Sequence, residues 1–260
     1  MPTSGKQNTA STFSSASQAP GFGKRPAAEV LRLPGHSRID LAIRWGNKQP
    51  DGIYLTSRYG LLRLSPVNSA IVRITFSPSG KILPGPPTGI RTDRLEKRFS
   101  LRDGGSTLTL SLPELSVKVD KLSGALSFLS GEQKLLLAEQ KKLSRLAAPG
   151  SQALTRFFTF FDFDKKEQLY GIHPSGAAIL KLNASTAYLN EAADQRPPFL
   201  VSDKGYGILP LTQAPAIFCD LPAYGSYLYT ECQNQADYYF IAGKTQNTLL
   251  NAYAYLCGEL

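Results

Sequence analysis

Asp162 and Asp164 stand two positions apart in an aromatic segment, Thr155–Asp164, whose composition is typical of a strand. Both faces of this strand are apolar, so we expect it to lie between two layers of core. In a strand both carboxylates would lie on one face. Two carboxyl groups about 5–9.5 Å apart across a sugar-sized cleft are what hydrolysis of a glycosidic bond requires. Lys165 and Lys166 follow directly, as in a solvated strand end. We therefore interpret this pair as a surface rim and expect no catalytic residue there.

Metal and nucleophile chemistry has few residues to draw on. The chain has two histidines, His36 and His173, and three cysteines, Cys219, Cys232 and Cys257, with no CxxC pair of the kind that begins a zinc site. It also contains no GxSxG, P-loop or HExxH motif. We expect no metal, no other cofactor and reduced thiols.

The composition is that of a folded domain, with 42% hydrophobic and 19% charged residues in a chain of 260. No apolar run approaches the ~20 residues of a membrane helix, and no apolar stretch follows Met1 as in a secretory signal. We therefore expect a cytoplasmic protein that binds no membrane.

The net charge of +9 is unevenly distributed. Residues 1–100 carry 15 basic and 5 acidic side chains, whereas residues 201–260 carry 2 and 5. A basic first third is compatible with nucleic-acid or other anion binding. Without a dense Lys/Arg run or a basic helix, we favour arginines on the wet faces of strands and expect no nucleic-acid partner.

Short alternating segments dominate the chain after residue 29. Val72, Ile74 and Phe76 share one face of a strand and Arg73 and Thr75 the other, which is the period of a half-buried strand. Strands are expected at Ile39–Trp45 (followed by a turn at Gly46 and Asn47), Gly52–Thr56, Gly60–Leu64, Ala70–Phe76, Ser106–Leu112, Leu115–Val119, Ala125–Leu129, Thr155–Asp164, Pro198–Val201, Gly207–Leu211, Ala216–Cys219, Ser226–Thr230 and Asp237–Ala242. Residues 29–260 are thus predicted to form an all-β domain, a large antiparallel β-sandwich (supersandwich) with one C-terminal helix.

Two segments do not follow this pattern. Residues 1–28 are rich in Ser, Thr, Ala, Gly and Pro and contain no acid, so we expect a disordered leader. Glu132–Leu146 is compatible with a helix by composition, or with a strand plus a polar loop.

Three stretches in the second half of the chain carry a resemblance to a known family. They are EQLYG at Glu167–Gly171, PFLVSDKGYGIL at Pro198–Leu209 and DYYFIAGKT at Asp237–Thr245. Their order resembles the N-terminal, galactose-mutarotase-like β-sandwich of glycoside hydrolase family 31, the α-glucosidases and α-xylosidases. Val72–Phe76 and Val117–Leu126 also look like that domain's VRV strand and a V-V-K-TGAL hairpin, so the resemblance covers roughly residues 38–260.

The resemblance implies an accessory domain. In that family a (β/α)₈ barrel follows the sandwich and carries both catalytic aspartates, one in a W-DMNE-type motif, whereas this chain has a single Trp and reaches Leu260 where the barrel would begin. We expect a non-catalytic, carbohydrate-associated module that binds sugar weakly or docks on a barrel-bearing polypeptide. The alternatives are a subunit of a split α-glucosidase or α-xylosidase, and a structural protein without sugar binding.

The resemblance also implies where a sugar would be met, because in the family a loop between the YG and PF segments reaches over the barrel's sugar pocket. Here that loop is Ile172–Pro197, and it departs from the family in reading YGIHP where YGLGE is usual. PLTQ also replaces the aromatic–Asn pair that often follows KGYG. The candidate sugar contacts are His173, Tyr188, Asn190, Glu191, Asp194 and, in KGYG, Tyr206; the alternatives are a plain polar loop and a turn-packing Tyr206.

The C-terminal helix is predicted to begin at the N-cap Thr245 and to end at Gly258. Its apolar stripe is Leu249, Leu250, Tyr253 and Leu256, yet Ala252, Ala254, Tyr255 and Cys257 leave the opposite side barely polar, and no charged residue occurs within it. One interpretation is an apolar docking face for a family 31 barrel or a second copy of the chain, with Leu249, Ala252, Tyr253 and Tyr255 as candidates. The other is a helix packed fully on its own sandwich.

Overall fold

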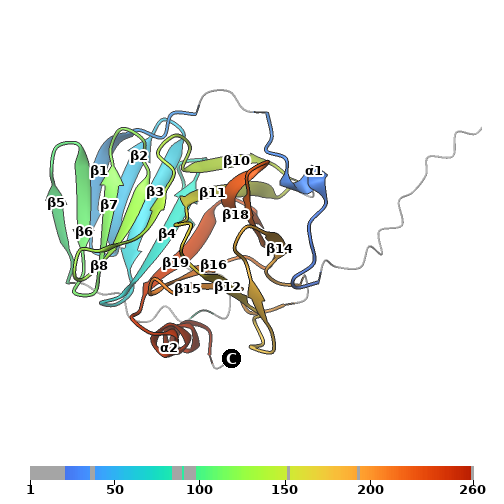
Figure 1. The fold of residues 1–260 in the computed structure, drawn as a ribbon. Coiled ribbons are helices and arrows are strands. Elements are labelled where there is room, and N and C mark those ends of the chain that lie inside the picture. The colour runs from blue at the N-terminus through green and yellow to red at the C-terminus, as the bar shows by residue number, and fades with distance from the viewer. Residues whose placement is uncertain are drawn as a thin grey trace, which may run out of the picture.

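The computed structural model describes residues 21–35, 39–83, 90, 98–150, 153–191 and 194–258. They form two antiparallel sheets packed face to face, with one helix against the outer side of the first sheet (Figure 1). The predicted all-β sandwich with a C-terminal helix is confirmed. Among these residues, neither helix is long and apolar enough to cross a membrane.

The first sheet, here called sheet A, joins the two ends of the domain. Its strands in spatial order are β1 (Ile43–Gln49), β2 (Gly52–Ser57), β3 (Gly60–Pro66), β4 (Ile71–Ser77), β19 (Ala236–Ala242), β16 (Tyr206–Pro210), β15 (Phe199–Ser202), β12 (Leu169–Ile172) and β13 (Ile179–Lys181). The late strand β19 therefore lies between β4 and β16 in the middle of the sheet.

The second sheet, sheet B, packs on the inner face of sheet A. Its order is β14 (Thr186–Tyr188), β17 (Ile217–Leu221), β18 (Gly225–Cys232), β11 (Thr155–Asp162), β9 (Leu135–Glu139), β8 (Leu126–Ser130), β7 (Leu115–Asp120), β6 (Thr107–Ser111) and β5 (Ser100–Asp103), with β10 (Arg145–Pro149) also paired to β11.

The core lies between the sheets, where the alternating side chains predicted it. Val72, Ile74 and Phe76 point into it from β4. Phe128 of sheet B stacks on Phe240 of sheet A, with ring centroids 3.9 Å apart. The period of two therefore identified the inward face correctly, but the prediction of a half-buried strand was wrong, because all seven residues of β4 are buried.

Strand β11 is apolar on both faces because it separates two layers of core. Phe157 and Phe161 face the inter-sheet core, whereas Phe158 and Phe160 face a second cluster outside sheet B. The short helix α1 (Ala28–Leu31) covers that cluster with Leu31, whose carbonyl accepts a hydrogen bond from Tyr227 at 2.8 Å. The prediction of two core layers around this strand is confirmed.

The N-terminal segment pairs with the sandwich before α1 begins. Gly23 N–H donates to the carbonyl of Tyr188, and Tyr188 N–H donates to the carbonyl of Lys24. Residues 21–28 therefore differ from the disordered leader that their composition predicted, because pairing of backbone groups leaves no trace in side-chain composition. Residues 1–20 of that leader lie outside the described residues.

The first strand runs over Ile43–Gln49 and turns at Pro50 and Asp51, so the prediction of Ile39–Trp45 with a turn at Gly46 and Asn47 was wrong. A register shift between Ile43 and Trp45 breaks the regular alternation there. In Glu132–Leu146 the alternative of a strand plus a polar loop is confirmed, since β9 occupies Leu135–Glu139.

Helix α2 (Gln246–Cys257) packs on its own sandwich. The Thr245 hydroxyl accepts from Thr248 N–H at 3.2 Å, and Gly258 has φ 84°, so both predicted ends are confirmed. Leu249 and Tyr253 are buried against sheet A, which leaves neither side chain accessible to a partner. Ala252 is half-buried and packs against the same apolar cluster as Leu249 and Tyr253, so Tyr255, which is 37% exposed, is the one docking candidate left on the outer side of the helix.

Candidate functional site

Three of the predicted sugar contacts lie together, and we call them the His173 cluster: His173, Glu191 and Asp194. The Nε2 atom of His173 lies 3.8 Å from Oδ2 of Asp194, and the same carboxylate oxygen accepts the Glu191 N–H at 2.6 Å. The other imidazole nitrogen, Nδ1, is 2.7 Å from the Ser175 hydroxyl, and the Phe22 ring meets the imidazole edge-on at 5.0 Å. The cluster thus presents an imidazole and two carboxylates within one small surface.

The cluster is positioned by the end of β12 and by the loop that follows β14. His173 N–H donates to the carbonyl of Ala178, and Gly176 N–H donates back to the carbonyl of His173, which closes the turn to β13. Asp194 N–H in turn donates to the Glu191 carbonyl. Planar carboxylates and an imidazole fixed in this way suit hydrogen bonds to the hydroxyls of a small polar ligand.

Tyr188 lies on β14, next to the N-terminal segment that carries Phe22. It is half-buried, and burial together with the Glu231 carboxylate raises the pKa of its hydroxyl. It therefore borders the side of the molecule where residues 21–24 pair, rather than belonging to the His173 cluster itself.

Asn190 and Tyr206 are buried, which leaves them no surface for a sugar. The Asn190 amide joins two backbone groups of one loop, accepting from Ala216 N–H at 2.7 Å and donating to the Ala214 carbonyl at 3.2 Å. Tyr206 stacks on Phe240 at 5.3 Å. Its hydroxyl has a pKa well above 10, first because of burial and second because of the nearby Glu167 carboxylate.

The Asp162 and Asp164 carboxylates lie at the exposed end of β11. Asp164 accepts from Lys166 N–H at 3.0 Å and lies 3.9 Å from the Lys204 ammonium. Its side chain thus holds a turn together, in agreement with the surface rim that the sequence predicted.

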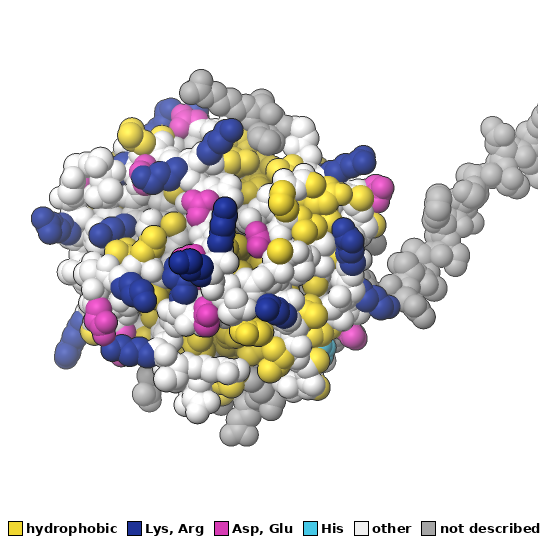
Figure 2. All heavy atoms as spheres, in the orientation of Figure 1, with side chains coloured by type: hydrophobic (Ala, Val, Ile, Leu, Met, Phe, Trp, Pro, Cys, Tyr) yellow, Lys and Arg dark blue, Asp and Glu magenta, His cyan; other side chains and the backbone are white. Residues whose placement is uncertain are grey.

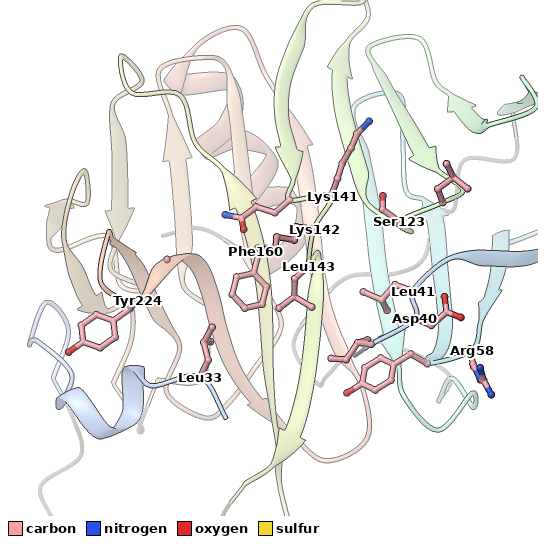
Figure 3. A pocket seen from close by; sticks show the side chains of 15 residues that line it. Leu33, Asp40, Leu41, Arg58, Ser123, Lys141, Lys142, Leu143, Phe160 and Tyr224 are labelled. Atoms are coloured by element: carbon pink, nitrogen blue, oxygen red, sulfur yellow. The ribbon is translucent and has the colours of Figure 1, made fainter. Parts of the chain in front are cut away.

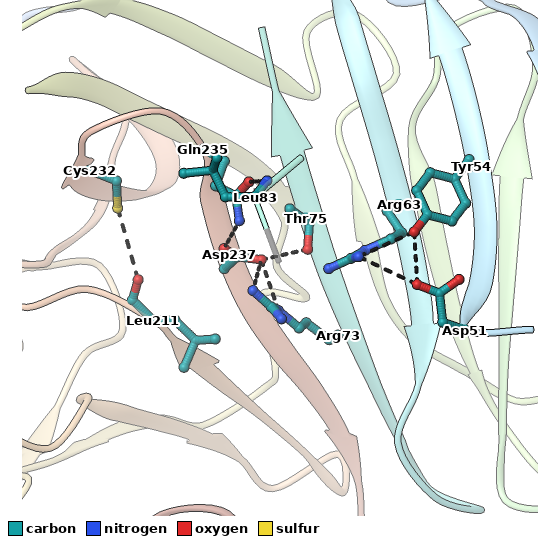
Figure 4. A network of polar contacts seen from close by, with 10 residues as sticks. All are labelled: Asp51, Tyr54, Arg63, Arg73, Thr75, Leu83, Leu211, Cys232, Gln235 and Asp237. Carbon is teal, nitrogen blue, oxygen red and sulfur yellow. Dashed lines mark hydrogen bonds and ion pairs between the residues drawn. The ribbon is translucent and has the colours of Figure 1, made fainter. Parts of the chain in front are cut away.

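The motifs that carry the family resemblance bind one another inside the fold. Arg73, in the VRIT stretch, donates through Nε to Oδ1 of Asp237, the first residue of DYYFI, at 2.9 Å. Thr75 donates to the same oxygen, and Gln235 donates to Oδ2 at 2.8 Å (Figure 4). Since β4 and β19 are neighbours, this buried network fixes their register from the outer face of sheet A.

The other motifs are joined in the same way. Ser202 of PFLVS donates its hydroxyl to the buried carboxylate of Glu167, the first residue of EQLYG. A Cβ added to Gly207 of KGYG would lie 2.6 Å from two ring carbons of Phe199, the Phe of PFLVS. Packing and register therefore account for these residue types.

A buried ion pair that the sequence analysis missed connects the two sheets. Arg145 bonds the carboxylate of Glu139 and donates to the Gly124 carbonyl, and Tyr238 of sheet A donates to Glu139 at 3.0 Å. Burial raises the pKa of Glu139, although Arg145 counteracts it. The polar loop composition of residues 140–144 hid this pair, because neither residue stands in a recognisable motif.

Charge is mixed on one face of the molecule. On the face shown in Figure 2, Lys and Arg side chains are dispersed among acidic ones. Among the described residues no group of three or more His, Cys, Asp or Glu could hold a metal ion. The arginines of β3 and β4 are buried in ion pairs, Arg63 with Asp51 and Arg73 with Asp237, so the expectation of arginines on wet strand faces was wrong for these two.

Comparison with known proteins gives a consistent fold. No protein-family model and no curated protein matches the sequence. A GH31 dextranase of Flavobacterium johnsoniae, solved with glucose, is similar with a TM-score of 0.71 and 17% identity, over 85% of this chain and 29% of the dextranase.

Two α-xylosidases show the same likeness. A GH31 α-xylosidase from a soil metagenome, solved with xylose, has a TM-score of 0.67 and 19% identity, over 82% of this chain and 34% of its own. The GH31 α-xylosidase of Xanthomonas citri has a TM-score of 0.62 and 14% identity, over 81% of this chain and 40% of its own. The chain thus spans less than half the length of these enzymes, and it has the fold of the N-terminal β-sandwich domain of glycoside hydrolase family 31, as the KGYG and DYYFI stretches predicted.

Proposed function

We propose that this chain is a carbohydrate-associated accessory domain, which presents the His173 cluster to a sugar held by a family 31-type (β/α)₈ barrel. The observation that carries the proposal is the geometry of this cluster. An imidazole and a carboxylate 3.8 Å apart stand on the loop that, by the family resemblance, reaches over the barrel's sugar pocket. The similar dextranase and α-xylosidase were solved with glucose and xylose, which supports a sugar of that class.

The residues of the His173 cluster have separate roles. The Ser175 hydroxyl and the Phe22 ring hold the imidazole of His173, whose Nε2 faces Asp194. Glu191 is exposed and supplies the outermost carboxylate. A single shallow cluster offers few hydrogen bonds, so the domain binds sugar weakly by itself and tightly only where a barrel completes the pocket.

Proton NMR of the two imidazoles tests the cluster directly. Isomaltose or xylose at tens of millimolar should shift the ring signals of His173 and leave those of His36 unchanged, because only His173 belongs to the cluster. The chain has two histidines, so a His36→Gln variant assigns the signals.

Asp194→Asn keeps the shape of the side chain and removes its charge, and it should weaken the response to sugar at least severalfold. Asp203→Asn, at the β15–β16 turn, is the matched control and should leave the response intact. Sugar-independent spectra, or equal responses in all variants, would refute a sugar contact at this cluster.

The 260-residue chain is expected to hydrolyse neither nitrophenyl α-glucoside nor nitrophenyl α-xyloside. Glu191 and Asp194 come from one loop and are joined through the Glu191 N–H, so they cannot flank a glycosidic bond from two sides as that reaction requires. Release of nitrophenolate by pure protein is the measurement. Turnover that disappears when a residue of this chain is mutated would show that the domain is itself a catalyst.

A further inference from the structure

A groove crosses one end of the sandwich, and none of the residues of the His173 cluster lines it. It has a volume of about 990 Å³ and is walled by the turns β2–β3, β7–β8 and β17–β18 and the β9–β10 loop. Figure 3 shows it extending from Tyr224 at one end, past Phe160 and Leu143, to Asp40 and Arg58 at the other. Cavities of ~300–1,000 Å³ enclose ligands of several rings, so this groove is large enough for a short chain of sugars.

A smaller pocket of about 230 Å³ lies at the sandwich edge, where β1 and β5 end their respective sheets. Its lining combines the apolar Leu101 and Leu108 with Asn47 and with Trp45. Trp45 is 59% exposed and is the only tryptophan in the chain. Among the described residues, Tyr255 is the only other exposed aromatic side chain, so an open indole beside a pocket is unusual for this molecule.

The groove and the pocket adjoin. Asp40 of the groove is ion-paired at 3.1 Å with Arg44 of the pocket. Lys121 of the pocket is followed directly by Leu122 and Ser123 of the groove, and its carbonyl accepts from Ile43 N–H at 2.8 Å. The two recesses therefore form one extended surface, with Trp45 at one end and Tyr224 at the other.

The charged groups of this surface leave an excess of positive charge. Asp40 is ion-paired with Arg44, and Asp103 is ion-paired with Lys121. Lys141 is ion-paired with Asp120, which lies outside the groove. Arg58 and Lys142 have no acidic partner among the described residues. Two cations of the groove are therefore available to a ligand.

We propose that this surface binds an oligosaccharide that carries carboxylate groups, such as a uronic-acid chain, with one sugar ring against Trp45 and its carboxylates at Arg58 and Lys142. Aromatic faces accept the C–H side of a sugar ring, while amide, hydroxyl and guanidinium groups bond its hydroxyls. Gln140, Ser123 and Asn47 supply neutral polar groups between the charged ones.

Other occupants fit less well. An extended peptide binds mainly through a free strand edge, whereas this groove is walled mostly by turns and connecting segments. A second copy of the chain could pair through β1, which is an edge strand of sheet A. If two β1 strands paired antiparallel with Gly46 opposite Gly46, Arg44 of each copy would lie opposite Lys48 of the other, and like charges directly opposite are destabilising.

The fluorescence of the sole tryptophan reports on the proposed contact. A titration with tetragalacturonate at low salt should shift Trp45 emission to the blue and saturate, whereas isomaltotetraose should bind at least about tenfold more weakly for lack of carboxylates. Arg58→Ala/Lys142→Ala should weaken tetragalacturonate binding about tenfold or more. The matched control Lys134→Ala/Lys165→Ala, which removes two exposed cations outside both recesses, should not.

Calorimetry with Trp45→Ala completes the test, and binding should fall at least about tenfold with the circular dichroism spectrum unchanged. His173→Ala should leave all these titrations as in the wild type, which separates this surface from the proposed function. The inference is overturned if Trp45 emission does not respond, if the two double variants behave alike, or if tetraglutamate binds as tightly as tetragalacturonate.

Discussion

Replacing Arg145 with leucine is expected to lower the free energy of unfolding by about 3–5 kcal/mol at pH 8, because it leaves a buried charge without its partner. The Arg145 side chain is 4% exposed and bonds Glu139, whose carboxylate is fully enclosed between the sheets. The Gly124 carbonyl also loses its donors, two guanidinium nitrogens at 3.1 Å. Urea denaturation followed by circular dichroism measures the change.

This loss should become smaller as the pH falls. Burial raises the pKa of Glu139, and without Arg145 the pKa rises further because the opposing charge is gone. A carboxyl with a higher pKa in the folded state takes up a proton on folding. The contribution of this proton uptake to the free energy of unfolding is complete below the pKa of Glu139 in the unfolded chain, about 4.3. It is lost as the pH rises through the pKa of Glu139 in the folded protein. The difference between wild type and R145L should therefore be smaller at pH 5 than at pH 8.

Two further variants test whether the loss of stability comes from the buried charge. Arg102→Leu, on the exposed strand β5, is the matched control and should change stability by no more than about 0.5 kcal/mol. Adding Glu139→Leu to R145L should restore part of the loss, since no buried charge remains, but not all, because Tyr238 and Leu126 N–H lose their acceptor. A double variant as unstable as R145L would show that packing, and not charge, is what Arg145 supplies.

Gly207→Ala is expected to destabilise the protein by about 1–3 kcal/mol and to loosen helix α2. The new Cβ would lie 2.6 Å from the Cε2 and Cζ atoms of Phe199, a side chain that is 1% exposed. The Phe199 ring packs against Tyr253 of α2 with centroids 5.1 Å apart, so it can move only by displacing the helix. Hydrogen exchange should accelerate in α2 more than in β7 and β8, which lie in the other sheet.

Rescue and control variants keep this prediction specific. Phe199→Leu in the Gly207→Ala background should recover part of the stability, because a smaller side chain makes room for the methyl group. Gly35→Ala, whose added Cβ would meet nothing within 4 Å, should be neutral. Uniform exchange throughout the chain in Gly207→Ala would indicate a global effect without a particular connection to the helix.

Sequence patterns predicted strands best where burial has a simple period. The alternation of Val72, Ile74 and Phe76 gave the inward face of β4, and the aromatic run of Thr155–Asp164 gave two core layers. Strands β13 and β14 escaped prediction because each has only three residues, too few to show a period of two. Their pairing depends on neighbouring strands and leaves no periodic signal within the segment itself.

The arrangement of the candidate site was predicted in part, for a similar reason. His173, Glu191 and Asp194 do meet, because turns bring the ends of β12 and of the loop after β14 together. Asn190 and Tyr206 have residue types that suit a sugar equally well, yet both are enclosed. Residue type specifies which hydrogen bonds a side chain can make, whereas burial decides whether its partner is another part of the protein or a ligand. Burial depends on contacts between segments that are distant in the sequence, so the residue type alone does not reveal it.

The central position of β19 has a consequence for how the protein is made. Ile71 of β4 pairs with Ile241 of β19, so residues 78–235 are synthesised between two neighbours in one sheet (Figure 1). At ~5–20 residues per second on the ribosome, roughly 8–30 s pass between the two strands. Throughout that interval β4 exposes an unpaired, apolar edge, which is the kind of surface that draws nascent chains into aggregates. Slower initiation, lower temperature and more chaperone should therefore raise the soluble yield of this domain without changing its stability once folded.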